Sequence, residues 1–162
     1  MLIFWKNKML TTKDLENYLK ENNITYEIQI HEETYSAAKA SEILKVEIDK
    51  IIKSLIFINE KDEPILVIIP GNKKVNQTKL AKMLGFKKLR LAKPEEVIEH
   101  TGYEAGGVPP VGHKKQLQCY IDEEIIGKEF VYGGGGAVNA TLKIKPKDII
   151  KLTQGKVIRM PI

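Results

Sequence analysis

The order of apolar and polar residues predicts helices and strands that follow one another along the chain. Leu15, Tyr18 and Leu19 recur at the spacing of one helical face, and Thr11 with Asp14 three residues later can cap that helix. The same kind of spacing predicts further helices over residues 37–44, 48–53, 78–84, 94–102 and 146–152. We therefore expect helices in every part of the chain.

The segments between these helices have the pattern of strands. Residues 26–30 alternate between apolar and polar, and short apolar runs predict the other strands at 55–58, 65–69, 89–92, 117–121, 130–132, 142–144 and 157–158. A polar turn at 60–63 joins two of them into a hairpin. Because tight turns connect some strands and helices connect others, we expect a mixed α/β fold with a central mixed β-sheet surrounded by helices.

Length and composition fit one soluble domain. The chain has 162 residues, of which 43% are apolar and 29% charged, and its single cysteine, Cys119, excludes an internal disulfide. We expect one domain over residues 12–162 after an N-terminal extension over residues 1–11. No apolar run approaches the ~20 residues that span a bilayer, and the first ten residues lack the features of a secretion signal. We expect a cytoplasmic protein without a membrane partner.

Charge is unevenly distributed along the chain. The formal net charge is +5, but residues 73–93 hold eight basic residues and no acidic one. Such a segment can form a positive face that attracts phosphates, although a lysine-rich composition explains it equally well. Only Arg90 and Arg159 are arginines, which argues against base-specific recognition of DNA.

Several common catalytic motifs are missing. The run 133–136 lacks the Lys-Ser/Thr of a phosphate-binding P-loop, and no Gly-x-Ser-x-Gly nucleophile motif is present. His31, His100 and His113 are far apart in the sequence, and one cysteine cannot build a structural zinc site. We therefore expect that an enzyme with this sequence works without a metal, a cofactor or a covalent Ser or Cys intermediate.

Three stretches carry unusual residues. Residues 106–113 combine three glycines with two prolines, so a rigid loop can present its remaining amides to a ligand, although a structural turn is equally possible. Lys53 stands where an apolar helix end meets a buried strand, where a lysine needs either a function or an exposed ammonium. Four glycines at 133–136 predict close approach by another group, or else a wide turn or bulge.

Together these stretches resemble the YbaK/prolyl-tRNA-synthetase-associated domain family of aminoacyl-tRNA editing deacylases. The resemblance rests on residues 31–41 leading to 52–57, on 106–113 followed by 120–122, and on 133–136 before 140–144. It implies a strongly curved mixed sheet, and a trans-acting deacylase that hydrolyses the ester of a mischarged tRNA, tRNA(Pro) carrying Cys or Ala. The chain departs from the family at Pro109, where many bacterial members have serine, and it has no histidine in 134–139.

The resemblance also implies roles for individual residues. The family's lysine falls on Lys53 and its glycine–proline loop on 106–110, so Lys53 is expected to act as an electrostatic clamp, with the amides of Gly106 and Gly107 as an oxyanion site. A ribose hydroxyl of the substrate could orient the attacking water. The expected substrate-binding residues are Tyr35, Ser54, Val108, Pro109, Pro110, Gly112, His113, Gly134, Gly135 and Asn139.

The expected partners are the acceptor end of tRNA and an aminoacyl-tRNA synthetase. Lys73, Lys74, Lys87 and Lys88 are the candidates for contacts with the tRNA backbone. Within 106–113, His113 either contacts the ligand or braces the loop, and bracing is favoured. An alternative function is a tRNA- or nucleotide-binding module that has no catalytic activity and acts with a synthetase.

Overall fold

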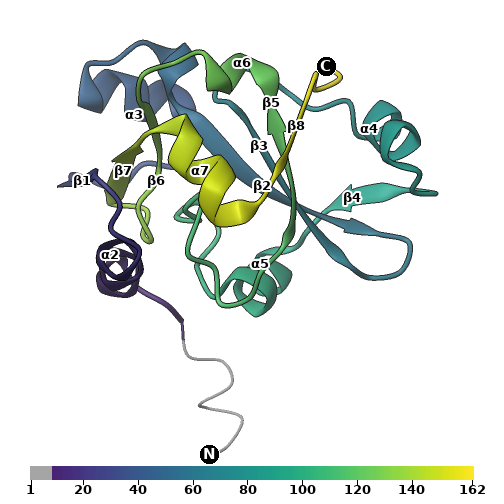
Figure 1. The fold of residues 1–162 in the computed structure, drawn as a ribbon, viewed down its shortest axis with the longest axis horizontal. Helices are drawn as coiled ribbons and strands as arrows, with labels where there is room; N and C mark the ends of the chain where they lie inside the picture. The colour runs from purple at the N-terminus through teal and green to yellow at the C-terminus, as the bar shows by residue number, and fades with distance from the viewer. Residues whose placement is uncertain (1–8) are drawn as a thin grey trace, which may run out of the picture.

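The computed structural model describes residues 9–162, whose strands form two β-sheets (Figure 1). The larger sheet has five strands in the order β4-β2-β3-β5-β8. Their bounds are β2 Ile52–Asn59, β3 Pro64–Pro70, β4 Leu89–Leu91, β5 Gln118–Asp122 and β8 Lys156–Ile158. Strand β2 is antiparallel to both of its neighbours, whereas β3, β5 and β8 run parallel to one another. The sheet is mixed, as the sequence predicts.

The smaller sheet is antiparallel and has the order β1-β7-β6. Its strands are β1 Tyr26–Ile30, β6 Val131–Gly134 and β7 Ala140–Ile144. A single bridge between Ile51 and Tyr132 links it to the start of β2. The predicted mixed α/β class is thus confirmed, with the strands divided between two sheets.

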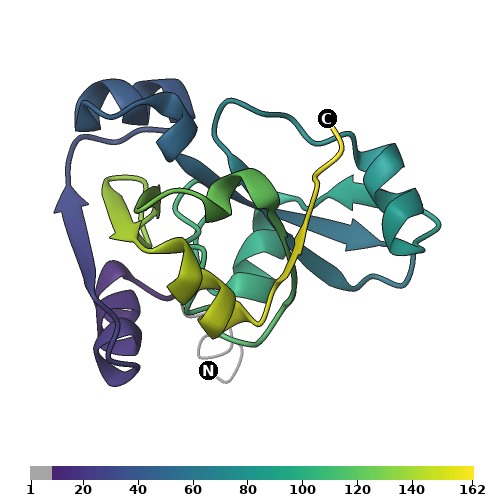
Figure 2. The same ribbon diagram turned by 45° about the horizontal axis from the view of Figure 1, so that its top comes forward.

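Helices pack around these sheets, with α3 at one end of the molecule and α4 beside β4 at the other (Figures 1 and 2). The helical segments are α2 Thr12–Glu21, α3 Ala37–Leu44, the 3-10 turn η1 Ile48–Lys50, α4 Gln77–Leu84, α5 Pro94–Thr101, α6 Glu123–Ile126 and α7 Pro146–Thr153. The predicted capping of α2 is present, because the Thr11 side chain accepts from the Asp14 amide and the Asp14 carboxylate accepts from the Thr11 amide.

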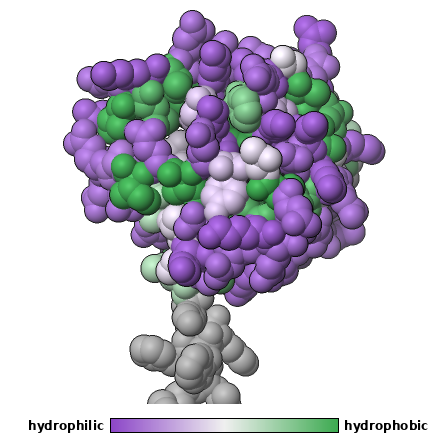
Figure 3. Space-filling view, turned by 60° about the vertical axis from the view of Figure 1, so that its left-hand side comes forward, coloured by the Kyte–Doolittle hydropathy of each residue, from purple (hydrophilic) through white to green (hydrophobic). Residues whose placement is uncertain are grey.

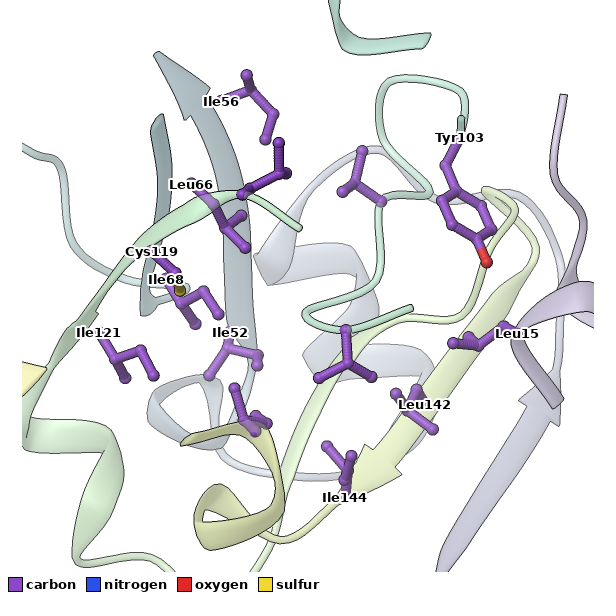
Figure 4. Packing of buried hydrophobic residues seen from close by; sticks show 14 of the residues in the cluster. Leu15, Ile52, Ile56, Leu66, Ile68, Tyr103, Cys119, Ile121, Leu142 and Ile144 are labelled. Atoms are coloured by element: carbon purple, nitrogen blue, oxygen red, sulfur yellow. The ribbon is translucent and has the colours of Figure 1, made fainter. Parts of the chain in front are cut away.

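The main core lies between the two sheets. Ile52, Leu66 and Ile121 from the larger sheet share one buried cluster with Leu142 and Ile144 of β7 (Figure 4). Residues of α2, α5, α6 and α7 complete this cluster, and a second cluster forms between the other face of the larger sheet and α4. Burial of these aliphatic side chains holds the two sheets together and fixes the groove where they meet.

Two local expectations need correction. The helix predicted over 48–53 is only the 3-10 turn Ile48–Lys50, and β2 already begins at Ile52. The β-branched pair Ile51 and Ile52 favours the extended conformation, so Lys53 lies within a strand and pairs with Ile69. The short helix α6 was not predicted. It is capped by Asp122, whose side chain accepts from the Glu124 amide.

Most of the N-terminal extension expected over residues 1–11 lies outside the described residues. Its last part joins the domain, since the Leu10 amide donates to the Gly102 carbonyl over 2.7 Å and the Leu10 side chain packs on the main core. Apolar residues form separate surface patches between hydrophilic ones on the side that carries α3 and β1 (Figure 3). Among residues 9–162, no helix is long and apolar enough to cross a membrane.

Candidate active site

A pocket of about 520 Å³ opens where the two sheets meet below α3. Its walls come from the start of β2, from α3 and the segment before it, from the loop at 106–108, and from β6 and β7. Gly71 lets α3 approach, because a Cβ there would lie 2.6 Å from the Cβ of Ala37. The pocket is therefore assembled from segments far apart in the sequence.

Six of the predicted site residues line this pocket: Lys53, Ser54, Tyr35, Gly106, Val108 and Gly134. The structure thus brings the lysine and the glycine–proline loop to the same cavity. The other predicted residues do not line it: Gly107, Pro109, Pro110, Gly112, His113, Gly135 and Asn139. Six of these seven lie in the stretches 106–113 and 133–136, which also contain residues that do line the pocket.

Lys53 is half-buried in the second position of β2. Its ammonium donates to the Lys73 carbonyl over 3.2 Å and has no acidic partner among residues 9–162. In the described part of the chain, no other charged side chain lines the pocket. The pocket therefore has a positive charge that is not neutralised by a carboxylate, and it favours a negative group or a developing negative charge.

The loop at 106–108, which lines the same pocket as this lysine, has backbone donors without a partner in the described part of the chain. The Gly107 amide donates to the Glu104 carbonyl over 3.1 Å and is therefore already occupied. The amides of Gly106 and Val108 have no hydrogen-bond partner among residues 9–162. The hydroxyl of Ser54 is likewise buried without a partner in the described part of the chain. Unsatisfied polar groups of this kind are costly unless a ligand or water satisfies them.

The glycines of both segments allow two backbones to touch. A Cβ on Gly107 would lie 2.8 Å from the backbone of Ala137, and a Cβ on Gly134 would overlap the carbonyl oxygen of Val108. A Cβ on Gly135 would lie 2.7 Å from the carbonyl carbon of Ala140. The glycine run thus makes room for the backbone of the glycine–proline loop, and this loop is the group whose close approach the sequence predicts.

Two side chains hold the far end of this loop, those of the half-buried His113 and the buried Tyr103. The imidazole of His113 donates from Nε2 to the Pro109 carbonyl over 2.7 Å, and the hydroxyl of Tyr103 donates to the Gly112 carbonyl over 3.3 Å. His113 faces a separate cavity of about 60 Å³. This position agrees with the interpretation that His113 braces the loop.

The burial of the His113 imidazole predicts that the stability of the protein depends on pH. Burial lowers the pKa of His113 to about 4, so the folded protein disfavours the charged ring and loses stability as the pH falls from about 6.5 towards 4. We expect this group to reduce the free energy of unfolding by about 2 kcal/mol between pH 7 and pH 5. Urea unfolding at both pH values should show a smaller reduction for His113→Gln. An equal reduction in both proteins would contradict the prediction.

The candidate tRNA-backbone lysines occupy different places. Lys73 forms ion pairs with Asp122, over 3.2 Å, and with Glu124, so its charge is offset within the protein. Lys74, Lys87 and Lys88 are exposed. The last two precede β4, which pairs with the far end of β2, about 15–20 Å from Lys53 at ~3.3 Å per strand residue.

Sequence reasoning missed Thr141, a pocket residue that is only 7% exposed. The alternation in β7 could have indicated it, because Leu142 and Ile144 face the core and Thr141 lies on the opposite face. Among residues 9–162, no group of three His, Cys, Asp or Glu side chains could hold a metal ion.

Comparison with known proteins identifies the family. Residues 31–152 match the model of the aminoacyl-tRNA editing domain. The "Putative Cys-tRNA(Pro)/Cys-tRNA(Cys) deacylase EbsC" of Enterococcus faecalis is 33% identical over 131 residues, which are 81% of this chain and 80% of that protein. The proline–tRNA ligase of Lactobacillus gasseri is 38% identical over 89 residues, which are 55% of this chain and 16% of the ligase.

A solved structure extends the similarity to the fold. The crystal structure of "a putative trans-editing enzyme for prolyl tRNA synthetase" superposes with a TM-score of 0.83 at 31% identity, and the match covers 93% of this chain and 96% of that one. The fold and the sequence thus lead to the same relatives. The chain belongs to the family of aminoacyl-tRNA editing domains.

Proposed function

We propose that this protein is a trans-acting aminoacyl-tRNA deacylase, which hydrolyses the ester between a wrong amino acid and the terminal adenosine of a tRNA. The observation that carries the proposal is the meeting of Lys53 with the free amides of Gly106 and Val108 in one pocket. An ester is already activated, so the protein needs to supply chiefly orientation and stabilisation of the oxyanion.

The proposed roles follow from the contacts. Because the Gly107 amide is occupied by Glu104, the oxyanion donors are the amides of Gly106 and Val108. The ammonium of Lys53, which is held at the pocket wall by the Lys73 carbonyl, adds positive charge beside them. The free hydroxyl of Ser54 and the exposed ring of Tyr35 remain for contacts with the amino acid and the terminal adenosine.

The proposed substrate is tRNA(Pro) that carries Cys or Ala. The names of the deacylase and the trans-editing enzyme to which the chain is similar support this choice, as does the similarity to the proline–tRNA ligase. A synthetase that charges proline is accordingly the proposed partner. Ile51, Val108 and Val138 give the pocket an apolar wall against which an uncharged amino-acid side chain can pack.

A deacylation panel tests the function. Purified protein is mixed with tRNA(Pro) charged with Cys, Ala, Ser or Pro, and ester hydrolysis is followed over time. We expect hydrolysis of Cys-tRNA(Pro) or Ala-tRNA(Pro) and no hydrolysis of Pro-tRNA(Pro), because the proposed deacylase removes wrong amino acids and leaves the correct ester intact. Binding of every tRNA without hydrolysis of any ester would instead establish a binding module without catalytic activity.

The exposed lysines before β4 should contribute to tRNA affinity. Replacing Lys87 and Lys88 by alanine should weaken binding and reduce the slope of log K against log salt by about 1–2, since each phosphate contact releases counterions. Filter binding at several salt concentrations measures the slope. The matched control is the double replacement of Lys147 and Lys151 on α7. Equal slopes for the wild type and the Lys87/Lys88 variant would remove this face from the binding site.

A further inference from the structure

The proposed hydrolysis is accelerated by a group that accepts a proton from water, and the pocket lining within residues 9–162 does not include one. Among these lining side chains there is no Asp, Glu, His or Cys. The ammonium of Lys53 is positively charged, and a ribose hydroxyl can orient water but is a weak proton acceptor. A base outside the lining can act on the pocket through a lining residue and so accelerate the hydrolysis.

His31 is placed to act on the pocket in this way. Nε2 of His31 lies 2.8 Å from the hydroxyl oxygen of Thr141, and Thr141 lines the pocket. Nδ1 of the same ring lies 2.6 Å from the Glu32 carbonyl oxygen. Because a carbonyl oxygen can only accept, Nδ1 carries the proton of the neutral ring, and Nε2 accepts the proton of the Thr141 hydroxyl. The backbone thus selects the tautomer that makes Nε2 a base.

The placement of this pair is rigid. Thr141 is paired with Gly134 on one side and with Gln29 on the other, and it is 7% exposed. The segment that carries His31 is held to the residue before β7, since the His31 amide donates to the Asn139 carbonyl over 2.8 Å. Gly134 in turn touches the carbonyl of Val108. The hydroxyl of Thr141 therefore lies one strand away from the proposed oxyanion donors.

We propose that His31 and Thr141 form the proton relay of the site, an inference that rests on the proposed function. The hydroxyl oxygen of Thr141 accepts a hydrogen bond from the attacking water. As the water oxygen bonds to the ester carbon, the water proton moves to Thr141 Oγ1, and the Thr141 proton moves to Nε2 of His31. When the bond from carbon to ribose oxygen breaks, the proton returns by the same path to that oxygen, and the neutral pair is restored.

Three variants test the relay on the aminoacyl-tRNA(Pro) that the wild type hydrolyses fastest. Thr141→Val removes the hydroxyl at nearly constant volume, and His31→Gln can still accept from Thr141 but cannot take up a proton. Each should lower kcat on the order of 100-fold with little change in KM, as expected for loss of a general base. Thr141→Ser should recover most of the rate lost in Thr141→Val. The double variant should be no slower than either single variant.

His100→Gln is the matched control, because it makes the same chemical change at a histidine of α5 that does not line the pocket. Its kcat should equal that of the wild type. A kcat above one third of the wild-type value in His31→Gln would overturn the relay while leaving the deacylase function intact. If Thr141→Val does not fold, His31→Gln and Thr141→Ser decide by themselves. A wild type that hydrolyses none of the panel would overturn the function and the relay together.

Discussion

Replacing Lys53 by alanine should lower the rate of deacylation on the order of 1000-fold, because the pocket then loses the one charged side chain that residues 9–162 contribute to its lining. Stability should change little. Within residues 9–162 the ammonium makes one hydrogen bond, to the Lys73 carbonyl, and because Lys53 is only half-buried, water can take the place of the lost donor. Single-turnover hydrolysis and thermal unfolding of the same preparations measure the two effects.

Lys50→Ala is the matched control for this experiment. Lys50 is exposed at the end of η1, three residues before Lys53, and it does not line the pocket. It should retain the wild-type rate, so that a loss in Lys53→Ala cannot come from net charge alone. Deacylation by Lys53→Ala at the wild-type rate would show that Lys53 is a structural residue and would remove the electrostatic clamp from the mechanism.

The convergence of Lys53 with the loop at 106–108 was predicted from the resemblance to the editing-domain family, whereas the residue types alone only marked both stretches as unusual. A lysine amid isoleucines is rare without a function, and a loop of glycines and prolines is rigid. The position of Lys53 within β2 was not predicted. The spacing of Ile48, Ile51 and Ile52 favours a helix up to Lys53, whereas the β-propensity of isoleucine favours a strand. Pairing with β3 places Lys53 in the strand.

Other features of the site depend on contacts between distant segments, which a local pattern does not contain. The division into two sheets follows from pairing of β1 with β7 across more than a hundred residues. The contact of His31 with Thr141 follows from the same pairing. The hydrogen bond from the Gly107 amide to the Glu104 carbonyl forms within a local turn. Nothing in the residue types, however, distinguishes Gly107 from Gly106. Glycine permits either conformation, and only the fold selects between them.

Gly134→Ala should both destabilise the protein and abolish the proposed deacylation, since two segments of the site touch at this glycine. The added Cβ would overlap the carbonyl oxygen of Val108 and lie 2.7 Å from its carbonyl carbon. Both partners are backbone, so relief requires a shift of the loop rather than of a side chain. Overpacking of this kind costs about 1–3 kcal/mol, which corresponds to a fall in Tm of roughly 2–12 °C for a chain of this size.

Gly127→Ala is the matched control, because a Cβ there meets nothing within 4 Å and Gly127 has the ordinary right-handed backbone conformation. Alanine at this position should leave the rate unchanged and raise stability by about 0.5 kcal/mol through a smaller entropy of the unfolded chain. The decisive comparison is made below the Tm of both variants. A folded Gly134→Ala protein that hydrolyses its substrate at the wild-type rate would show that the position of the Val108 amide does not matter. In that case the oxyanion would have to be stabilised by the Gly106 amide and Lys53 without the Val108 amide.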